Sequence, residues 1–207
     1  MSPPGHKLSK GLKTLSKKDA DIARAIETAG PPAPRQLETG IATLLRIIID
    51  QQVSVHAGRA IWKRLEEGLS GDVSAKSILK AGDEKLKSCG LSRPKARYAL
   101  CLADAVEQGT LDLEALPGMS DDDVNKQLTA ITGIGRWTAD IYSMFALGRE
   151  DIWPSGDLAV AEATKRLLGL EARPTPAELD IIGERWQPWR SEVAILLWHY
   201  YKRVPAL

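Results

Sequence analysis

Apolar residues recur every three or four positions along most of the chain, which is the spacing of one face of an α-helix. Clear examples are the runs 39–52 and 190–203. Proline, glycine and polar capping residues interrupt these runs, and no segment keeps the strict apolar–polar alternation of a half-buried strand. The pattern therefore predicts an all-α fold of about ten helices.

Residues with side-chain oxygens stand where several of these runs begin. Ser16 and Asp19 have the spacing of a capping box, with Asp in place of the usual Glu. Ser54, Ser120 and Asp157 each precede another run and are expected to begin a helix there.

Composition changes along the chain predict its organisation. Residues 1–15 carry several lysines among prolines and glycines, which indicates a flexible basic arm. Residues 16–207 are expected to form one domain of two helical lobes. The first lobe comprises about 16–52 and 146–207, and the second comprises about 53–145. A cleft between two helical lobes is a natural ligand site.

One stretch departs from simple helix punctuation. A helical run ends near Ile131, Gly133-Ile134-Gly135 follows, and a second run starts at once with Arg136. Glycine tolerates the φ > 0 conformations of a tight turn, and it leaves backbone N–H groups accessible to an anion at a helix N-terminus. A phosphate could bind here with Arg136 beside it. A plain helical hairpin is the simpler alternative.

A carboxylate follows twenty residues after Trp137, at the start of another predicted helix. Asp157 stands behind a Trp-Pro-Ser-Gly loop. Taken alone it reads as an ordinary N-cap. Trp186, Trp189 and Trp198 lie further along and supply aromatic faces that could stack on a base. Some of these tryptophans are expected to serve only as core packing.

Composition excludes several classes of protein. The 207 residues are 43% hydrophobic and 27% charged, an ordinary globular balance, and no apolar run approaches the length of a membrane span. The net charge is +1, so binding to nucleic acid must depend on a local patch. Two cysteines cannot hold a four-cysteine iron–sulfur cluster. No export signal is visible, so we expect a cytoplasmic location, at the nucleoid in a bacterium.

Four ordered motifs together resemble one family. They are the segments Gly133–Ala139, Asp151–Leu158, Asp50–Ser54 and Glu184–Ser191. They are similar to the hairpin, the aspartate loop, the glutamine-rich segment and the C-terminal Trp-x-Pro-Trp-Arg-Ser motif of the helix-hairpin-helix DNA glycosylases. The finer resemblance is to the 3-methyladenine DNA glycosylase II (AlkA-type) branch, and it covers residues 35–203.

The resemblance implies a role for each matching position. Asp157 is the implied catalytic carboxylate. Trp137 and Trp198 would line the base pocket, together with Ile141, which stands where the family has a third aromatic residue. Gln52 takes the position of the wedge that enters the duplex, where the family's best-known member has an apolar side chain. The implied DNA contacts are Gln52, Gly133, Gly135, Arg136 and Thr138.

The resemblance also implies the chemistry. Bifunctional members carry a lysine nucleophile where this chain has Trp137, so we expect base removal without strand cleavage. Asp157 would stabilise an oxocarbenium-like sugar or activate water after the base is flipped out. The backbone carbonyls of Thr129, Ile131 and Gly133 would hold Na+ or K+, and no cofactor is expected for catalysis.

The implied substrate is double-stranded DNA with alkylated bases, bound by a monomer in the cleft expected between the two lobes. The lesions expected are N3- and N7-alkylated purines, of the 3-methyladenine and 7-methylguanine type, with ethenoadenine and N1-methyladenine as further candidates. Two alternatives remain: a non-catalytic helix-hairpin-helix DNA-binding module, in which Asp157 is merely an N-cap, and a structural helical protein that binds no DNA.

Overall fold

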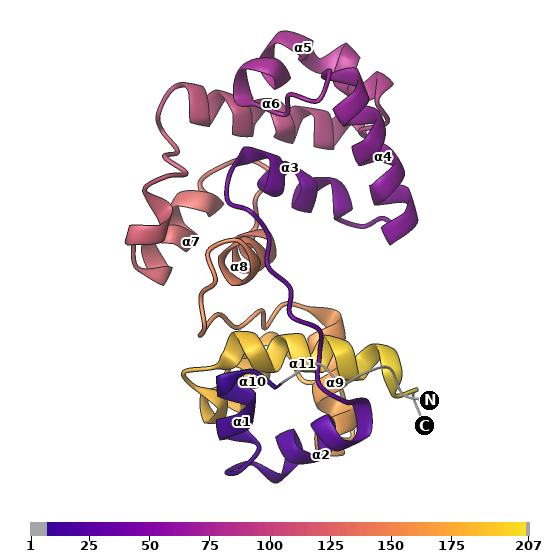
Figure 1. The fold of residues 1–207 in the computed structure, drawn as a ribbon, viewed down its shortest axis with the longest axis vertical. Helices are drawn as coiled ribbons and strands as arrows, with labels where there is room; N and C mark the ends of the chain where they lie inside the picture. The colour runs from indigo at the N-terminus through magenta and orange to yellow at the C-terminus, as the bar shows by residue number, and fades with distance from the viewer. Residues whose placement is uncertain (1–7, 206–207) are drawn as a thin grey trace. The chain divides into compact units, whose positions relative to one another are not determined.

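The computed structural model describes residues 8–205, and within them the regular secondary structure is helical, which confirms the predicted all-α fold (Figure 1). None of the helices in this part of the chain is long and apolar enough to cross a membrane. The α-helices are α1 (Lys10–Leu15), α2 (Ala20–Ala29), α3 (Ile41–Asp50), α4 (Val55–Gly68), α5 (Ala75–Ser88), α6 (Arg93–Glu107), α7 (Asp121–Thr129), α8 (Arg136–Phe145), α9 (Leu158–Leu168), α10 (Pro176–Gly183) and α11 (Arg190–Arg203). Two 3-10 helices, η1 (Leu116–Gly118) and η2 (Glu184–Trp186), complete the set.

The chain divides into two units. Of the described residues, those up to Gln36 and those from Gly148 onward form the first unit, and Leu37–Leu147 form the second. This division differs from the sequence prediction for residues 37–52, which groups them with the terminal helices. The reason is the strongly apolar helix α3, which packs on α4, α6 and α8 and is therefore the core of the second unit.

Helix α11 organises the first unit by packing on α9, α2 and α1. Two tryptophans fill the core nearby. Trp186 is fully buried, and its ring meets that of Trp153 edge-on, with centroids 5.3 Å apart. The indole N–H of Trp153 donates to the carbonyl of Leu179 at 2.9 Å, so its polar atom is satisfied. Trp186 is therefore a core residue, as expected for some of the three tryptophans Trp186, Trp189 and Trp198, and Trp153 is a core residue as well.

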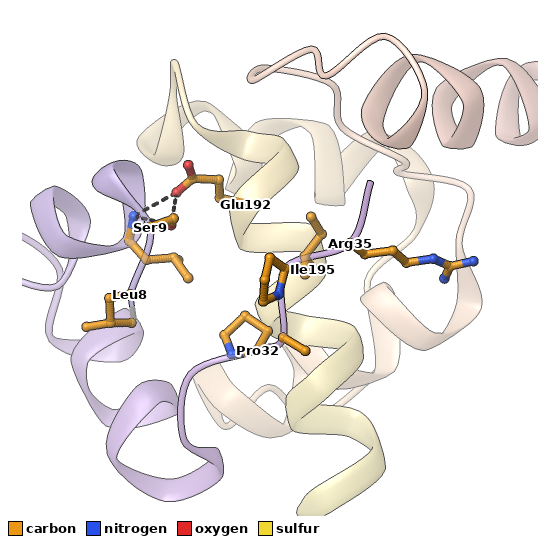
Figure 2. Close-up of a pocket in the computed structure, with 9 residues that line it drawn as sticks. Leu8, Ser9, Pro32, Arg35, Glu192 and Ile195 are labelled. Atoms are coloured by element: carbon orange, nitrogen blue, oxygen red, sulfur yellow. Dashed lines mark hydrogen bonds between the residues drawn. The ribbon is translucent and has the colours of Figure 1, made fainter. Parts of the chain in front are cut away.

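Residues 10–15 form helix α1 and are not part of a flexible arm, which corrects the sequence expectation. Leu12 and Leu15 are buried, and Glu192 of α11 accepts hydrogen bonds from the Ser9 hydroxyl and, at 2.8 Å, from the Leu12 N–H (Figure 2). A Cβ at Gly11 would overlap Glu192 and Trp189, so this glycine allows a close approach. The part of the expected arm in residues 1–7 lies outside the described residues.

An apolar pocket lies beside α1 in the first unit. Leu8, Pro32 and Ile195 line it, and Arg35 lies at its margin (Figure 2). Its apolar lining comes from α1 and Leu8 before it, from the segment after α2, and from α11.

The cap at the start of α2 also differs from the sequence expectation. Asp19 is the N-cap and accepts from the N–H groups of Asp21 and Ile22, whereas Ser16 ends α1. The second carboxylate oxygen of Asp19 accepts from the Trp186 indole N–H at 3.0 Å and pairs with Arg185 at 2.7 Å. Asp19 therefore joins the start of α2 to η2, which the spacing of Ser16 and Asp19 could not indicate.

In the second unit the predicted helix starts at Ser54 and Ser120 are confirmed, since each hydroxyl accepts a backbone N–H. Gly82 adopts φ 69° and ψ 176° inside α5, so this helix consists of two pieces joined at a kink.

Candidate active site and DNA-binding elements

Gly133 and Gly135, which lie between α7 and α8, are in different structural situations. Gly133 has φ 96°, and a Cβ there would overlap the ring of Tyr98, so the fold itself requires glycine. Gly135 has φ −88°, and a Cβ built on it would have no neighbour within 4 Å. The fold does not require a glycine at this position. A bare backbone here suits the close approach of another molecule.

The N-terminus of α8 has no side-chain cap. Gly135 is the N-cap and can offer no side-chain acceptor to the first N–H groups. Arg136 is exposed, and its Nε lies 3.8 Å from Oδ2 of Asp140. Trp137 is 36% exposed. An uncapped helix N-terminus beside an exposed arginine is suited to bind a phosphate.

Two residues assigned to the ligand face are buried within the second unit. Thr138 is only 2% exposed, and its hydroxyl accepts a hydrogen bond from the Gln51 side chain at 2.8 Å. The Thr138 hydroxyl therefore has an internal partner, and the implied DNA contact of this residue stays a prediction. Ile141 is also buried, with 6% of its surface exposed. Helical spacing placed both residues near Trp137, but it did not show which face of α8 is covered.

Gln52 lies on the surface in an unusual backbone conformation. It follows the end of α3, is exposed, and has φ 54°, a region that residues other than glycine adopt at some energetic cost. Val53 and Val55 beside it are also exposed, Val55 by 68%. The segment 51–55 therefore presents the polar side chain of Gln52 followed by two exposed valines, and apolar side chains of this kind are the usual wedges between base steps.

Two side chains that the sequence did not single out hold this segment. Gln51 bonds Thr138 and, at 3.4 Å, the carbonyl of Gly133. Lys95 of α6 donates from Nζ to the carbonyls of Ile49 and Gln51, both at 2.7 Å. Burial lowers the pKa of Lys95, and the charge of Asp50 partly opposes this shift. These partners lie 44 to 87 positions apart, so no local pattern could reveal them.

The carbonyls implied as cation ligands belong to the hairpin. Ile131 O accepts from the Ile134 N–H at 3.0 Å, and Gly133 O is the one that Gln51 approaches. A carbonyl oxygen has a second lone pair, so these bonds leave the residues able to coordinate an ion. Among the residues the structure describes, no group of three or more His, Cys, Asp or Glu side chains could hold a metal.

Asp157 is the N-cap of α9, as the simpler interpretation predicted, and it has a further partner. Its Oδ1 accepts from the N–H groups of Ala159 and Val160, each at 2.9 Å. The indole N–H of Trp198 on α11 donates to the same oxygen at 3.0 Å. The side chains of Asp157 and Trp198 are both half-buried. Three N–H groups therefore fix the carboxylate, and one of them comes from an implied base-pocket residue.

The C-terminal motif fastens the loop that leads to Asp157. Arg190 forms two parallel 2.8 Å bonds to the carboxylate of Asp151. The Ser191 N–H donates to the carbonyl of Glu150 at 3.0 Å, and its hydroxyl accepts from the Ile152 N–H at 2.9 Å. The two motifs that were matched separately in the sequence therefore form one structural assembly.

Three similarities to known proteins accompany this geometry. A Bacillus subtilis relative, YfjP, is 28% identical over 75% of this chain, which spans only 56% of that relative's length. The structure of Schizosaccharomyces pombe 3-methyladenine DNA glycosylase in complex with abasic DNA matches with a TM-score of 0.84 and 28% identity, over 92% of this chain and 95% of that one. The structure of the Bacillus halodurans DNA-3-methyladenine glycosidase matches with a TM-score of 0.77 and 33% identity, over 92% and 88%.

Residues 45–188 match the family described as HhH-GPD superfamily base excision DNA repair protein. This segment includes the hairpin, the loop at Gln52 and the aspartate loop, which are the features described above. The chain therefore belongs to the HhH-GPD superfamily of base excision DNA repair proteins.

Proposed function

We propose that this chain is a monofunctional DNA glycosylase of the 3-methyladenine DNA glycosylase II type. It removes alkylated purines such as 3-methyladenine and 7-methylguanine from double-stranded DNA and acts as a monomer. The observation that carries the proposal is Asp157, a carboxylate held by three N–H donors in a chain of this superfamily. The names of the yeast and Bacillus halodurans proteins support the substrate class.

The chemistry follows from the charge of the substrate. An alkylated purine is cationic and leaves readily, and breaking the N-glycosidic bond places positive charge on the sugar. A preoriented carboxylate stabilises that charge without having to reorganise during the reaction. Asp157 is already oriented by Ala159, Val160 and Trp198. The same carboxylate can orient or deprotonate the water that attacks the sugar.

Trp137 determines two further properties. The position carries no amine, so no Schiff base forms with the sugar, and the strand stays intact. The partly exposed indole offers an aromatic face to the flipped base. Such a face attracts a cation by about 0.5–2 kcal/mol, which favours alkylated purines over neutral ones.

DNA binding is assigned to the second unit. The N-terminus of α8 and Arg136 bind a backbone phosphate, and Gln52 enters the duplex when the base is flipped out. The carbonyls of Thr129, Ile131 and Gly133 would hold Na+ or K+, which supplies positive charge near a phosphate. Because the leaving group is cationic, the proposed reaction requires no catalytic cofactor.

The test is a base-release assay on duplexes with single defined lesions, run with the wild-type chain and Asp157→Asn. Asparagine caps a helix as well as aspartate does, so α9 should stay intact. We expect the variant to release bases at least about 100-fold more slowly while it binds DNA as before. If wild-type protein binds DNA but releases no base, the chain is a binding module. If Asp157→Asn keeps its rate, another residue is catalytic.

The monofunctional assignment has its own measurement. The products should be the free base and an intact strand with an abasic site, which is cleaved only after alkali treatment. Borohydride present during the reaction should trap no covalent protein–DNA complex. A trapped complex would show an amine nucleophile and contradict the role given to Trp137.

A further inference from the structure

The segment that carries Gln52 is attached to two other helices of the second unit. Gln51, the residue before it, donates from its side-chain amide to the hydroxyl of Thr138 in α8 at 2.8 Å. Thr138 is buried and Gln51 is half-buried, so this bond is partly shielded from water. The loop is thereby tied to the first turn of the helix that is assigned to a DNA phosphate.

Lys95 fixes the same segment from α6. Its ammonium bonds the carbonyls of Ile49 and Gln51, which lie at the C-terminal end of α3, where backbone carbonyls lack helical partners. A cation is also favoured there by the partial negative charge of the helix terminus. Lys95 therefore binds two backbone carbonyls within the three residues that precede Gln52.

These bonds explain how Gln52 keeps a left-handed backbone. A residue other than glycine at φ 54° persists only where its surroundings hold it. Thr138 holds the Gln51 side chain, and Lys95 holds the Gln51 carbonyl. The residue immediately before Gln52 is therefore fixed at both its side chain and its backbone. Gln52 itself stays exposed.

We propose that Gln51 and Lys95 are positioning residues that hold the loop with Gln52 in the conformation that enters duplex DNA. The inference rests on the proposed function, because it assigns these residues to the base-flipping step. The Gln51–Thr138 bond also fixes the distance between the inserted residue and the phosphate-binding turn of α8. A flexible loop would lose that alignment, and extrusion of a paired base would become harder.

The expected signature is a defect that depends on base pairing. Extruding a paired base costs a few kcal/mol, and a mismatched base is easier to extrude. A variant with a loosened loop should therefore be impaired on a lesion in a fully paired duplex and much less on the same lesion opposite a mismatch. A variant that is merely unstable should lose activity equally on both substrates.

The main test compares Thr138→Val, which keeps the shape and removes the acceptor, with Thr138→Ser, which keeps the hydroxyl. For Thr138→Val and for Gln51→Met we expect kcat/KM to fall about tenfold on the paired duplex and less than about twofold on the mismatched one. Thr138→Ser should retain wild-type selectivity. Thr164→Val is the matched control, because that buried hydroxyl bonds the carbonyl of Val160 within α9.

Lys95 is tested in the same way. Lys95→Met removes the ammonium and should show the same pairing-dependent loss, while Lys95→Arg should restore part of the activity. Lys87→Met is the control, because Lys87 pairs with Asp83 and Glu84 on the surface of α5. Equal losses on paired and mismatched lesions, or no loss on either, would overturn the positioning role.

A second readout separates this inference from the proposed function. A 2-aminopurine placed opposite the target base reports unstacking by its fluorescence, without any need for base release. The wild-type chain should raise the fluorescence of a paired duplex, and Thr138→Val should raise it less. If the wild-type chain unstacks the duplex but never releases a base, the glycosylase assignment fails and the positioning role stands. If Thr138→Val unstacks as well as wild type, the positioning role fails.

Discussion

Helices α8 and α9 begin in opposite ways. At the start of α8 the N-cap is Gly135, which has no side chain to occupy the first N–H groups. At the start of α9 the N-cap is Asp157, whose Oδ1 accepts two backbone N–H groups and the indole N–H of Trp198. Both helix ends carry the same partial positive charge. At α8 no N-cap side chain offsets this charge, so the helix end suits an external anion. At α9 the charge stabilises the carboxylate of Asp157.

The difference shows that a single residue decides what a helix N-terminus does. A carboxylate at the N-cap stabilises its helix and becomes oriented in return. A glycine at the N-cap gives up most of that stabilisation and leaves room for a ligand backbone. The proposed glycosylase uses both arrangements, one for binding a phosphate and one for charge stabilisation. Exchanging the two residues tests this directly.

The largest effect is expected when α9 is given the cap of α8. Asp157→Gly removes the carboxylate and should slow base release at least about 100-fold. A glycine N-cap weakens a helix by only a few tenths of a kcal/mol, so most of the rate loss cannot come from unfolding. Single-turnover base release and thermal unfolding measure the two effects. A rate loss matched by a collapse in stability would reduce Asp157 to a structural cap.

The reverse exchange should separate stability from binding. Gly135→Asp has space for its side chain and a suitable backbone, so α8 should gain about 0.3 kcal/mol. The new carboxylate would occupy the N–H groups and repel phosphate, and affinity for undamaged DNA should fall about tenfold at low salt, with a shallower salt dependence. Gly135→Ser, a neutral cap, should lose less affinity. Unchanged DNA binding by Gly135→Asp would remove this helix end from the interface.

The smallest effect concerns the third donor to Asp157. Trp198→Phe keeps an aromatic ring and loses the indole N–H, so kcat should fall about three- to tenfold with little change in KM. Trp198→Leu removes the ring as well and should also raise KM if the ring stacks on the base. Wild-type kcat in Trp198→Phe would mean that Ala159 and Val160 suffice to orient the carboxylate.

Much of the fold was predictable because its signals are local. The run 190–203 gave the bounds of α11, and Ser54, Ser120 and Asp157 cap the helices they precede. Helix α1 could not be predicted in this way. It has only six residues, too few to show a periodic pattern, and it is held by Glu192 at the far end of the chain. A helix of that length depends on tertiary contacts.

The candidate site also has parts with local sequence signals and parts that depend on long-range contacts. The hairpin, the implied wedge position and the aspartate could be predicted because each lies in a short motif of its own. Other contacts join residues that are far apart in the sequence. The indole N–H of Trp198 bonds Asp157, 41 positions away, and Lys95 bonds the carbonyl of Ile49 at the end of α3, 46 positions away. The burial of Thr138 was missed because the spacing of α8 places residues on a face without saying what covers that face. Long-range hydrogen bonds and burial had to come from the structure.

The bonds from Arg190 and Ser191 to the segment 150–152 limit how this protein can be recombined with its relatives. A chimera that takes the aspartate loop from one parent and the last helix from another would separate a carboxylate from its guanidinium and a hydroxyl from its backbone partner. Both segments therefore have to be inherited together. A crossover placed between them should give active offspring only when the two parents agree at Asp151, Arg190 and Ser191.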